Sequence, residues 1–180
     1  MIVLCWNVRE LGNPWAFLAL KRVIKRFSLN LVFLSETKLH NNEVERFRCV
    51  LGFEGALQVN SEGKIGGLIL FWKDWDVSMQ SFSKGHMDVK VKMNNGVLWR
   101  FSGFYGSPSQ SNRAVSWELL WRLRYVDNLP WVCEGDFHEV LNTNDKQGGS
   151  DRPILNMVNF RKAIDDYDLI DVGFTGPKLT

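Results

Sequence analysis

The sequence predicts an α/β fold of the sandwich type, and two observations support this prediction. Apolar residues recur at helical spacing near both ends of the chain, whereas the middle contains strand patterns that follow one another without helices between them. Consecutive strands of this kind are typical of antiparallel pairing. A doubly wound parallel sheet would alternate strands and helices along the whole chain, so the pattern favours a mixed α/β sandwich.

Two apolar segments in the first third of the chain predict buried strands. The first covers residues 1–6 and ends at Asn7, and the second covers residues 29–34 and is followed by Glu36. Ligands and metals usually bind at the rim of a sheet, where strands end. Asn7 and Glu36 are therefore candidate functional residues.

A helix is predicted after each of these strands. Gly12-Asn13-Pro14 supplies a turn, an N-cap and a proline at the first helical position, and an apolar face extends from there to Phe27. A second helix is predicted from Asn42, with Glu45 as its capping-box partner. The first helix carries four basic residues that form either its solvated face or a phosphate-facing surface, namely Lys21, Arg22, Lys25 and Arg26.

The middle of the chain is rich in strand signals. Strands are predicted, in order, over residues 57–59, 68–72, 76–82, 87–93 and 97–105. The fourth of these alternates between apolar and polar residues, which is typical of a half-buried strand. Asn94-Asn95-Gly96 follows it and predicts a β-hairpin with the last strand.

The last third combines one strand with two helices. Helical periodicity is found over residues 113–126 and again from about Met157 to Tyr167. Between them, Trp131-Val132-Cys133 predicts a strand, and Asp136 follows it. Leu169 is predicted to begin a further strand.

Three predicted strands therefore each deliver one oxygen-bearing side chain at the same kind of position. Taken singly, Asn7, Glu36 and Asp136 are ordinary turn or helix-cap residues. Their repeated placement at strand ends favours a shared site. Hard oxygen ligands of this number suit Mg²⁺ or Mn²⁺, which take one or two carboxylates and leave other positions to water and phosphate.

The composition limits the class of protein. A chain of 180 residues, 45% of them hydrophobic, is large enough for one globular domain with a substantial core. The net charge of +2 is too small to indicate a nucleic-acid-binding protein by itself. The three cysteines show no paired spacing, which indicates a reducing compartment. No apolar run approaches a membrane span and no secretory signal is seen, so we expect an intracellular protein, nuclear or cytoplasmic, that is not secreted and has no membrane partner.

Six segments of the chain form an ordered series of motifs, namely residues 6–14, 34–38, 66–68, 103–108, 131–141 and 171–180. In this order they resemble the endonuclease/exonuclease/phosphatase superfamily, which has the DNase I-like fold. Within it, they are most similar to the endonuclease domain of plant non-LTR (LINE-type) retrotransposons. The resemblance extends over the whole chain.

This resemblance implies a four-layer sandwich of two mixed β-sheets flanked by helices. It also implies a Mg²⁺- or Mn²⁺-dependent hydrolase that cleaves phosphodiester bonds, with nucleic acid, and DNA in particular, as its partner. By this resemblance Glu36 binds the metal, and Asn7 holds metal or phosphate. Tyr105 contacts the phosphate, although a buried aromatic at a strand end is an equal alternative. Asp136 binds the metal and orients or deprotonates the attacking water.

The chain departs from the family pattern in three places. His138 stands where the family usually carries Asn; it is a candidate catalytic donor or, alternatively, a ligand for a softer metal. Glu10 stands where these relatives usually have Gly. The family would continue beyond Thr180 into strands that carry Trp and Ser-Asp-His. His40 and His86 do not replace that histidine and are predicted to be surface residues of polar loops.

From these departures we expect residues 1–180 to form a single domain that is truncated at the C-terminus and weakly active or inactive. Effects within one catalytic unit do not add, so losing part of the unit can abolish most of the rate. Three readings stay open. The chain is an enzyme that nicks nucleic acid, a non-catalytic retrotransposon remnant, or a module that binds nucleic acid or metal without cutting.

Overall fold

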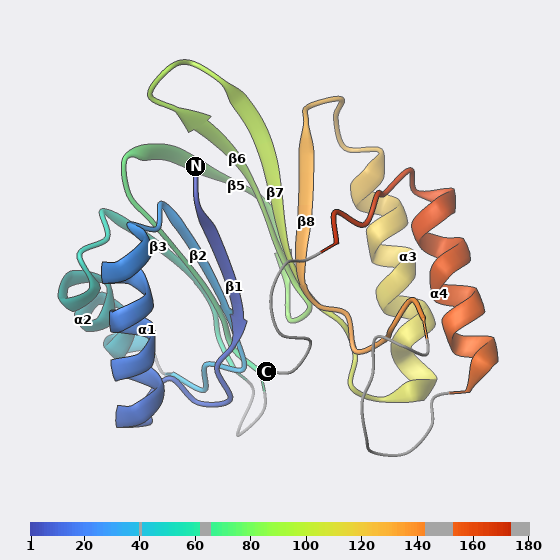
Figure 1. Ribbon diagram of the computed structural model, residues 1–180, viewed down its shortest axis with the longest axis horizontal. Coiled ribbons are helices and arrows are strands. Elements are labelled where there is room, and N and C mark those ends of the chain that lie inside the picture. The colour runs from blue at the N-terminus through green and yellow to red at the C-terminus, as the bar shows by residue number, and fades with distance from the viewer. Residues whose placement is uncertain (40, 62–65, 143–152, 174–180) are drawn as a thin grey trace. The chain divides into compact units, whose positions relative to one another are not determined.

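The computed structural model describes residues 1–39, 41–61, 66–142 and 153–173, apart from the side chains of residues 41 and 42. The chain forms two compact units (Figure 1). Unit 1 comprises Met1–Tyr105 and Leu129–Asp136, and unit 2 comprises Gly106–Asn128 and Phe137–Thr180. The single domain expected from the sequence stays a prediction, and each unit is described separately.

The first sheet of unit 1 has four strands in a mixed arrangement. In spatial order they are β1 (Val3–Asn7), β2 (Leu31–Ser35), β4 (Leu68–Trp72) and β3 (Gly55–Val59). β1 and β2 are parallel, whereas β4 is antiparallel to both β2 and β3. The parallel pair requires a crossover, which helix α1 (Pro14–Phe27) supplies.

The second sheet of unit 1 is also four-stranded and mixed. Its strands are β5 (Trp75–Ser83), β6 (His86–Met93), β7 (Leu98–Tyr105) and β8 (Trp131–Asp136), in that spatial order. β5, β6 and β7 are antiparallel neighbours, and the turn at Asn94-Asn95-Gly96 joins β6 to β7 as predicted. β8 pairs in parallel with β7.

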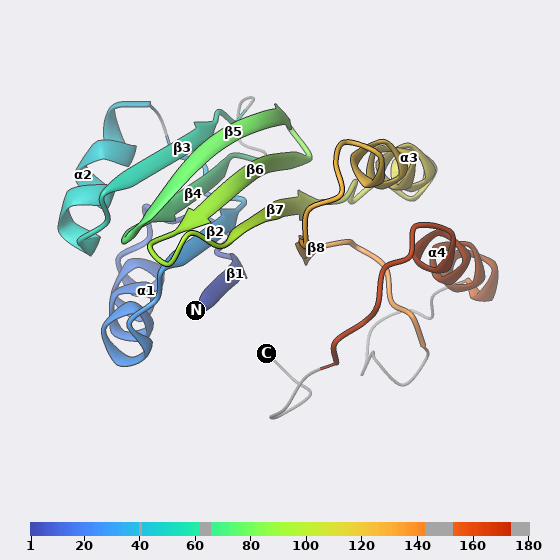
Figure 2. The same ribbon diagram turned by 90° about the horizontal axis from the view of Figure 1, so that it is seen from above.

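The two sheets pack face to face and share an apolar core (Figure 2). Leu31 and Phe33 of β2 face this core, and Phe33 lies 6.1 Å from Phe101 of β7, ring centroid to ring centroid. The alternate residues Val32 and Leu34 face a second core on the other side of the sheet. β2 is buried on both faces for this reason, which explains its continuous apolar run.

Helices α1 and α2 (Asn41–Leu51) cover the outer face of the first sheet. The N-cap of α1 is Asn13, whose side-chain oxygen accepts a hydrogen bond from the Trp15 backbone nitrogen at 2.9 Å, as the sequence predicts. Ser28 ends the helix in the left-handed conformation. The capping box expected at Asn42 involves a side chain outside the described residues.

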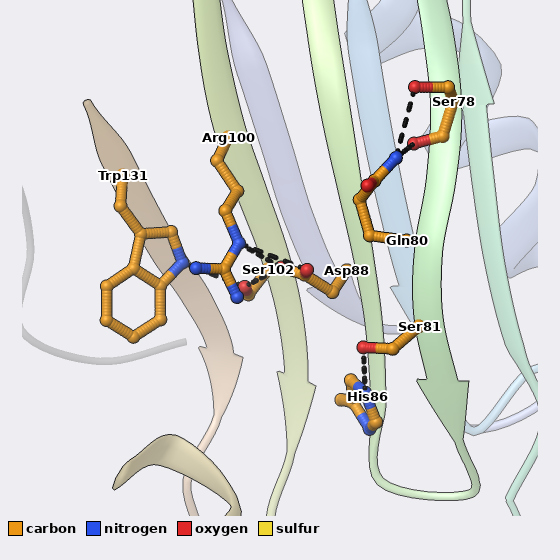
Figure 3. Close-up of polar contacts among 8 residues, drawn as sticks. All are labelled: Ser78, Gln80, Ser81, His86, Asp88, Arg100, Ser102 and Trp131. Atoms are coloured by element: carbon orange, nitrogen blue, oxygen red, sulfur yellow. Dashed lines mark hydrogen bonds and ion pairs between the residues drawn. The ribbon is translucent and has the colours of Figure 1, made fainter. Parts of the chain in front are cut away.

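A buried polar network lies on the outer face of the second sheet (Figure 3). The Arg100 Nε donates to both carboxylate oxygens of Asp88, at 2.8 and 3.0 Å, and the Ser102 hydroxyl donates to the same carboxylate at 2.5 Å. The Trp131 indole donates to the Ser102 hydroxyl at 2.8 Å, and its ring lies 5.1 Å from the Arg100 guanidinium. This network links β6, β7 and β8 and fixes how they align.

His86 lies on β6 near this network, and its predicted position in a surface loop is wrong. The residue is only 4% exposed, and its ring nitrogens contact the hydroxyls of Ser81 at 3.0 Å and Ser83 at 2.8 Å. Burial is the main cause that lowers the pKa of His86. The negative charge of Asp88 raises this pKa and the positive charge of Arg100 lowers it, and the net shift is downward. His86 is therefore a satisfied neutral residue of the sheet.

Unit 2 contains a short 3₁₀ turn (Gln110–Asn112) and two helices, α3 (Arg113–Arg124) and α4 (Ile154–Asp166). The helices lie side by side (Figures 1 and 2). Their contact is built from Trp117 of α3 with Phe160 and Ala163 of α4. The Arg113 guanidinium makes a buried ion pair with Glu139 at 2.9 Å.

The structure confirms the predicted fold class, an α/β sandwich with two mixed sheets and helices. It corrects two details. The predicted strand from Leu169 is wrong, because residues 169–173 form no strand, and α3 ends at Arg124, two residues before the predicted end at Val126. Within the described residues, no helix is both long and apolar enough to cross a membrane.

Candidate active site

The structure brings together Asn7, Glu36, Tyr105 and Asp136, all of which belong to unit 1. The Asn7 Nδ2 donates to Glu36 Oε1 at 2.8 Å and to Asp136 Oδ2 at 3.1 Å. The Tyr105 hydroxyl donates to the same Glu36 Oε1 at 2.8 Å. The four side chains therefore form one hydrogen-bonded cluster. The strand-end pattern predicts that Asn7, Glu36 and Asp136 share a site, and Tyr105 is expected there from the family resemblance alone.

Strand pairing explains why residues far apart in the sequence meet here. Asn7 lies opposite Ser35 in the parallel pair β1–β2, so Glu36 follows directly beside it. Tyr105 lies opposite Asp136 in the parallel pair β7–β8. The carboxyl ends of both pairs lie at the same edge of unit 1 (Figure 1), which is where polar ligands meet α/β sheets.

The backbone at Glu36 is held in an unusual conformation. Its φ is 54°, and that of Lys38 is 52°, both in the left-handed region that costs a non-glycine residue about 1–2 kcal/mol. Two hydrogen bonds stabilise this turn, from the Thr37 nitrogen to the Gly67 oxygen at 3.2 Å and from the Lys38 nitrogen to the Gly66 oxygen at 3.3 Å. Such strain is often found at functional sites.

Gly67 is the residue that makes this turn possible. A Cβ atom there would lie 2.7 Å from the Thr37 hydroxyl oxygen and 3.2 Å from the Lys38 nitrogen. Gly67 also has a φ of 89°, which glycine adopts freely. The Gly66-Gly67 step therefore serves to position Glu36, a role that sequence periodicity did not reveal.

Gly135 has the same kind of role for Asp136. Its φ is 148°, and a Cβ atom there would overlap the backbone oxygen of Phe104. β8 can thus lie close against β7. The next residues along the two strands, Tyr105 of β7 and Asp136 of β8, therefore lie opposite one another.

The phenol of Tyr105 is kept neutral by its surroundings. Burial raises its pKa, and the hydrogen bond to Glu36 and the negative charges of Glu36 and Asp136 raise it further. Tyr105 is 9% exposed. It is therefore a fixed hydrogen-bond donor at neutral and moderately alkaline pH.

The donor set fits a hard divalent cation. Glu36 and Asp136 supply two carboxylates on either side of one amide nitrogen, and Mg²⁺ typically binds one or two carboxylates together with water and phosphate oxygens. Within the described residues no group of three or more His, Cys, Asp or Glu could hold a metal ion. A metal here would thus depend on oxygens from water or substrate as well.

Asn7 faces the two carboxylates with its nitrogen, and its oxygen accepts a hydrogen bond from the Arg9 backbone nitrogen at 3.2 Å. In this orientation the amide nitrogen of Asn7 aligns the two carboxylates, and its oxygen does not point toward a metal held between them. Its predicted role as a metal ligand requires the opposite amide orientation and stays a prediction.

Comparison with known proteins shows what this architecture is similar to. No protein-family model and no curated protein matches the chain. The solved endonuclease domain of TRAS1, a telomere-specific non-LTR retrotransposon, superimposes with a TM-score of 0.65 and 14% identity, over 92% of this chain and 71% of that one. An AP endonuclease from Archaeoglobus fulgidus gives a TM-score of 0.64 and 15% identity, over 92% of this chain and 68% of that one.

The AP endonuclease LMAP from Leishmania major gives a TM-score of 0.62 and 12% identity, over 92% of this chain and 65% of that one. The chain has the DNase I-like fold that the sequence analysis predicts. It spans only 65%, 68% and 71% of these three solved structures. At such low identities the likeness establishes the fold.

The structure also describes two residues that depart from the motifs named in the sequence analysis. Glu10 has a φ of 116°, a conformation that glycine adopts more readily than glutamate, and its carboxylate lies 3.9 Å from the Lys38 ammonium. His138 belongs to unit 2 and has a φ of 54°. Its catalytic role stays a prediction. His40 and residues 174–180 of the last motif lie outside the described residues.

Proposed function

We propose that this chain is an endonuclease-type phosphodiester hydrolase, dependent on Mg²⁺ or Mn²⁺, that nicks DNA in the manner of a retrotransposon endonuclease domain. The observation that carries the proposal is the cluster in unit 1. One amide nitrogen contacts both carboxylates, and a neutral phenol donates to one of them. The DNase I-like fold supports it, because the solved structures it resembles include endonucleases.

Each residue of the cluster has a chemical task in this proposal. Glu36 and Asp136 would hold the metal, and Asn7 keeps the two carboxylates aligned through its amide nitrogen. A bound Mg²⁺ or Mn²⁺ supplies charge neutralisation at the phosphate and at the leaving oxygen. The Asp136 carboxylate accepts a hydrogen bond from the attacking water and orients it toward phosphorus.

Tyr105 is the donor for the phosphate in this scheme. Its pKa is raised by burial and by the adjacent carboxylates, so it carries its proton throughout the physiological range. When a phosphate enters, the hydroxyl can donate to a non-bridging oxygen, where negative charge accumulates in the transition state. Removing one such donor typically lowers kcat by about 100- to 1,000-fold.

His138 leads us to propose a low rate. It stands where the family pattern inferred from the sequence carries Asn, and an imidazole is bulkier than an amide and offers different hydrogen-bond donors. The same residue favours a second candidate function, namely a module that binds metal or nucleic acid without cleaving it. The two candidates differ in one observable, which is strand cleavage.

A plasmid-nicking assay with Mg²⁺ and Mn²⁺ tests the proposal. We expect the wild-type chain to convert supercoiled DNA slowly to the open circular form, and we expect Glu36→Gln and Asp136→Asn to abolish the conversion. Asp76→Asn, which changes an exposed carboxylate on β5, is the matched control and should leave nicking unchanged. Nicking that persists in both site variants would show that these carboxylates do not carry it.

A thermal melt with added Mn²⁺ separates the two candidates. Mn²⁺ at 100 times its Kd stabilises the folded state by about 2.7 kcal/mol, and Glu36→Gln should remove most of the resulting rise in Tm. A rise in Tm with salt-dependent DNA binding and no nicking supports the binding module. If Mn²⁺ does not raise the Tm and the chain does not nick DNA, both candidate functions are refuted.

A further inference from the structure

We propose that a groove between α3 and α4 of unit 2 binds an unpaired nucleobase. The proposal rests on the proposed function only in taking nucleic acid as the partner. The groove has a volume of about 280 Å³. The side chains that matter here are Trp117, Glu118 and Trp121 of α3, with Lys162 and Asp166 of α4 and Tyr167, which follows it.

The groove exists because small residues lie where the two helices face each other. Ala114 of α3 and Ala163 of α4 line it and leave space between larger neighbours. Trp117 is buried in the helix contact and packs on Phe160 with ring centroids 5.6 Å apart. Trp121 is spaced one helical turn from Trp117, so it lines the same face of α3.

An exposed aromatic ring marks the groove as a binding surface. Trp121 is 49% exposed although it is one of the largest apolar side chains. Tyr125 contacts it edge to face, with ring centroids 5.2 Å apart. An indole with a free face is a stacking platform for nucleobases, and such stacking stabilises binding of single strands by about 1–3 kcal/mol per base.

The polar groups of the groove include both acceptors and donors. Glu118 and Asp166 supply carboxylates, and Lys162 supplies an ammonium. One oxygen of Glu118 is held by Arg122 at 2.7 Å. The pKa of Tyr167 is raised by burial and then by the negative charges of Asp166 and Glu118, so both carboxylates act on the same part of the groove.

These groups set conditions on the occupant. A phosphate alone would be repelled by the two carboxylates, whereas an ammonium or guanidinium group would meet the carboxylates but would leave Lys162 without an acceptor and would not use the flat face of Trp121. An apolar helix from a partner would bury all three charged groups without giving them partners, which is strongly unfavourable. A nucleobase offers a flat face for Trp121, N–H groups for the carboxylates and carbonyl or ring-nitrogen acceptors for Lys162.

Fluorescence anisotropy with a labelled single-stranded DNA 12-mer tests the proposal directly. The comparison probe is a 12-mer of the same length whose sugars carry no bases, so it presents the phosphates alone. We expect the 180-residue chain to bind the normal strand at least about fivefold more tightly than the abasic strand, since stacking of one base contributes on that order.

Substitutions locate the effect. Trp121→Ala should weaken binding of the normal strand by about 5- to 150-fold, the range that follows from one stacked base. Trp121→Phe, which keeps an aromatic ring, should retain most of the affinity. Trp15→Ala is the matched control, because Trp15 is an exposed tryptophan of α1 in unit 1 and is 79% exposed. Circular dichroism and Tm confirm that each variant is folded.

Three results would overturn the assignment. The abasic strand could bind as well as the normal one, which would show contact with phosphate only. Trp121→Ala could bind like Trp15→Ala, which would place the base elsewhere. Tetramethylammonium chloride, compared with sodium chloride, could change the tryptophan fluorescence of the wild-type chain but not of Trp121→Ala while the strand changes neither, which would indicate a cation site.

The outcome is separable from that of the proposed function. The groove lies within unit 2, whereas Glu36 and Asp136 belong to unit 1. If both proposals hold, Trp121→Ala still nicks supercoiled plasmid with Mn²⁺ while its affinity for the single strand falls. If the chain never nicks DNA, the strand-binding comparison still gives its own answer.

Discussion

The close contact between β7 and β8 gives a prediction whose magnitude follows from the structure. Gly135→Ala would place a methyl group against the Phe104 backbone oxygen, at a backbone φ of 148°. Gly96→Ala is the matched control in the same sheet, because Gly96 also has a positive φ, 83°, but nothing lies within 4 Å of its Cβ position. Both substitutions place alanine at a positive φ, and only Gly135→Ala adds a clash.

The expected destabilisation differs accordingly. Gly96→Ala adds only the left-handed conformational term, about 1–2 kcal/mol, partly offset by about 0.4–1 kcal/mol because alanine restricts the unfolded chain. Gly135→Ala adds the same terms together with displacement of backbone, and overpacking of this kind costs a further 1–3 kcal/mol or so. We therefore expect Gly135→Ala to lower the free energy of unfolding by roughly 1–5 kcal/mol, and by about 1–3 kcal/mol more than Gly96→Ala does.

Urea unfolding followed by circular dichroism measures both variants. Because Asp136 is the neighbour of Gly135, a displaced β8 should also reduce the Mn²⁺-dependent rise in Tm, whereas Gly96→Ala should leave that rise unchanged. Equal stability of the two variants would refute the reasoning. It would mean that β8 can move away from Phe104 at no cost, and that the alignment of Tyr105 with Asp136 does not depend on this glycine.

Three further substitutions test the electrostatics. Tyr105→Phe should destabilise the fold by about 1.5–3 kcal/mol at pH 7 through loss of a hydrogen bond to a carboxylate. The folded state raises the pKa of Tyr105, so above about pH 10 the phenol of the unfolded chain ionises first. The difference in free energy of unfolding between the wild type and Tyr105→Phe should therefore shrink by about 1.4 kcal/mol per pH unit. A difference that stays constant with pH in urea unfolding would contradict this. His86→Gln should remove part of the acid destabilisation below about pH 6.5, because the lowered pKa of His86 makes protonation favour the unfolded chain; identical pH profiles of Tm for both proteins would show that His86 does not contribute. Asp88→Ala leaves the Arg100 charge buried and should cost about 3–5 kcal/mol in urea unfolding, and a loss below about 1 kcal/mol would mean that water reaches Arg100.

Part of the site was accessible from the sequence because of one physical rule. Asn7, Glu36 and Asp136 each follow an apolar run, and the carboxyl ends of parallel strands meet at one edge. Tyr105 differs, because an aromatic residue at the end of an apolar strand has no pattern of its own. Only the resemblance to a known family pointed to it.

Other features depend on partners that are distant in the sequence. The left-handed turn at Glu36 is set by Gly66 and Gly67, which pair with it across the sheet and are some thirty residues away. His86 is expected in a polar loop because it lies between the predicted strands 76–82 and 87–93, yet serines of the neighbouring strand satisfy its ring. Local patterns describe periodicity and cannot report such cross-strand partners.

Asp88 shows the same limit in a charged residue. It is one of the polar residues that alternate with apolar ones on β6, a pattern typical of a half-buried strand, and aspartate is rarely buried alone. The structure buries it completely beside Arg100, which lies twelve residues further along the chain. A hairpin turn brings the two residues together. The turn is predictable from the sequence, whereas the burial of the ion pair is not.

The side-chain nitrogen of Asn7 couples the carboxylates of Glu36 and Asp136. Its two protons serve Glu36 and Asp136 at once, so a ligand that draws one carboxylate aside also changes the hydrogen bonding of the other. Occupancy at either carboxylate is thereby felt by its neighbour, and thermodynamic linkage requires the influence to run equally in both directions. A single amide thus makes two acids respond as a pair.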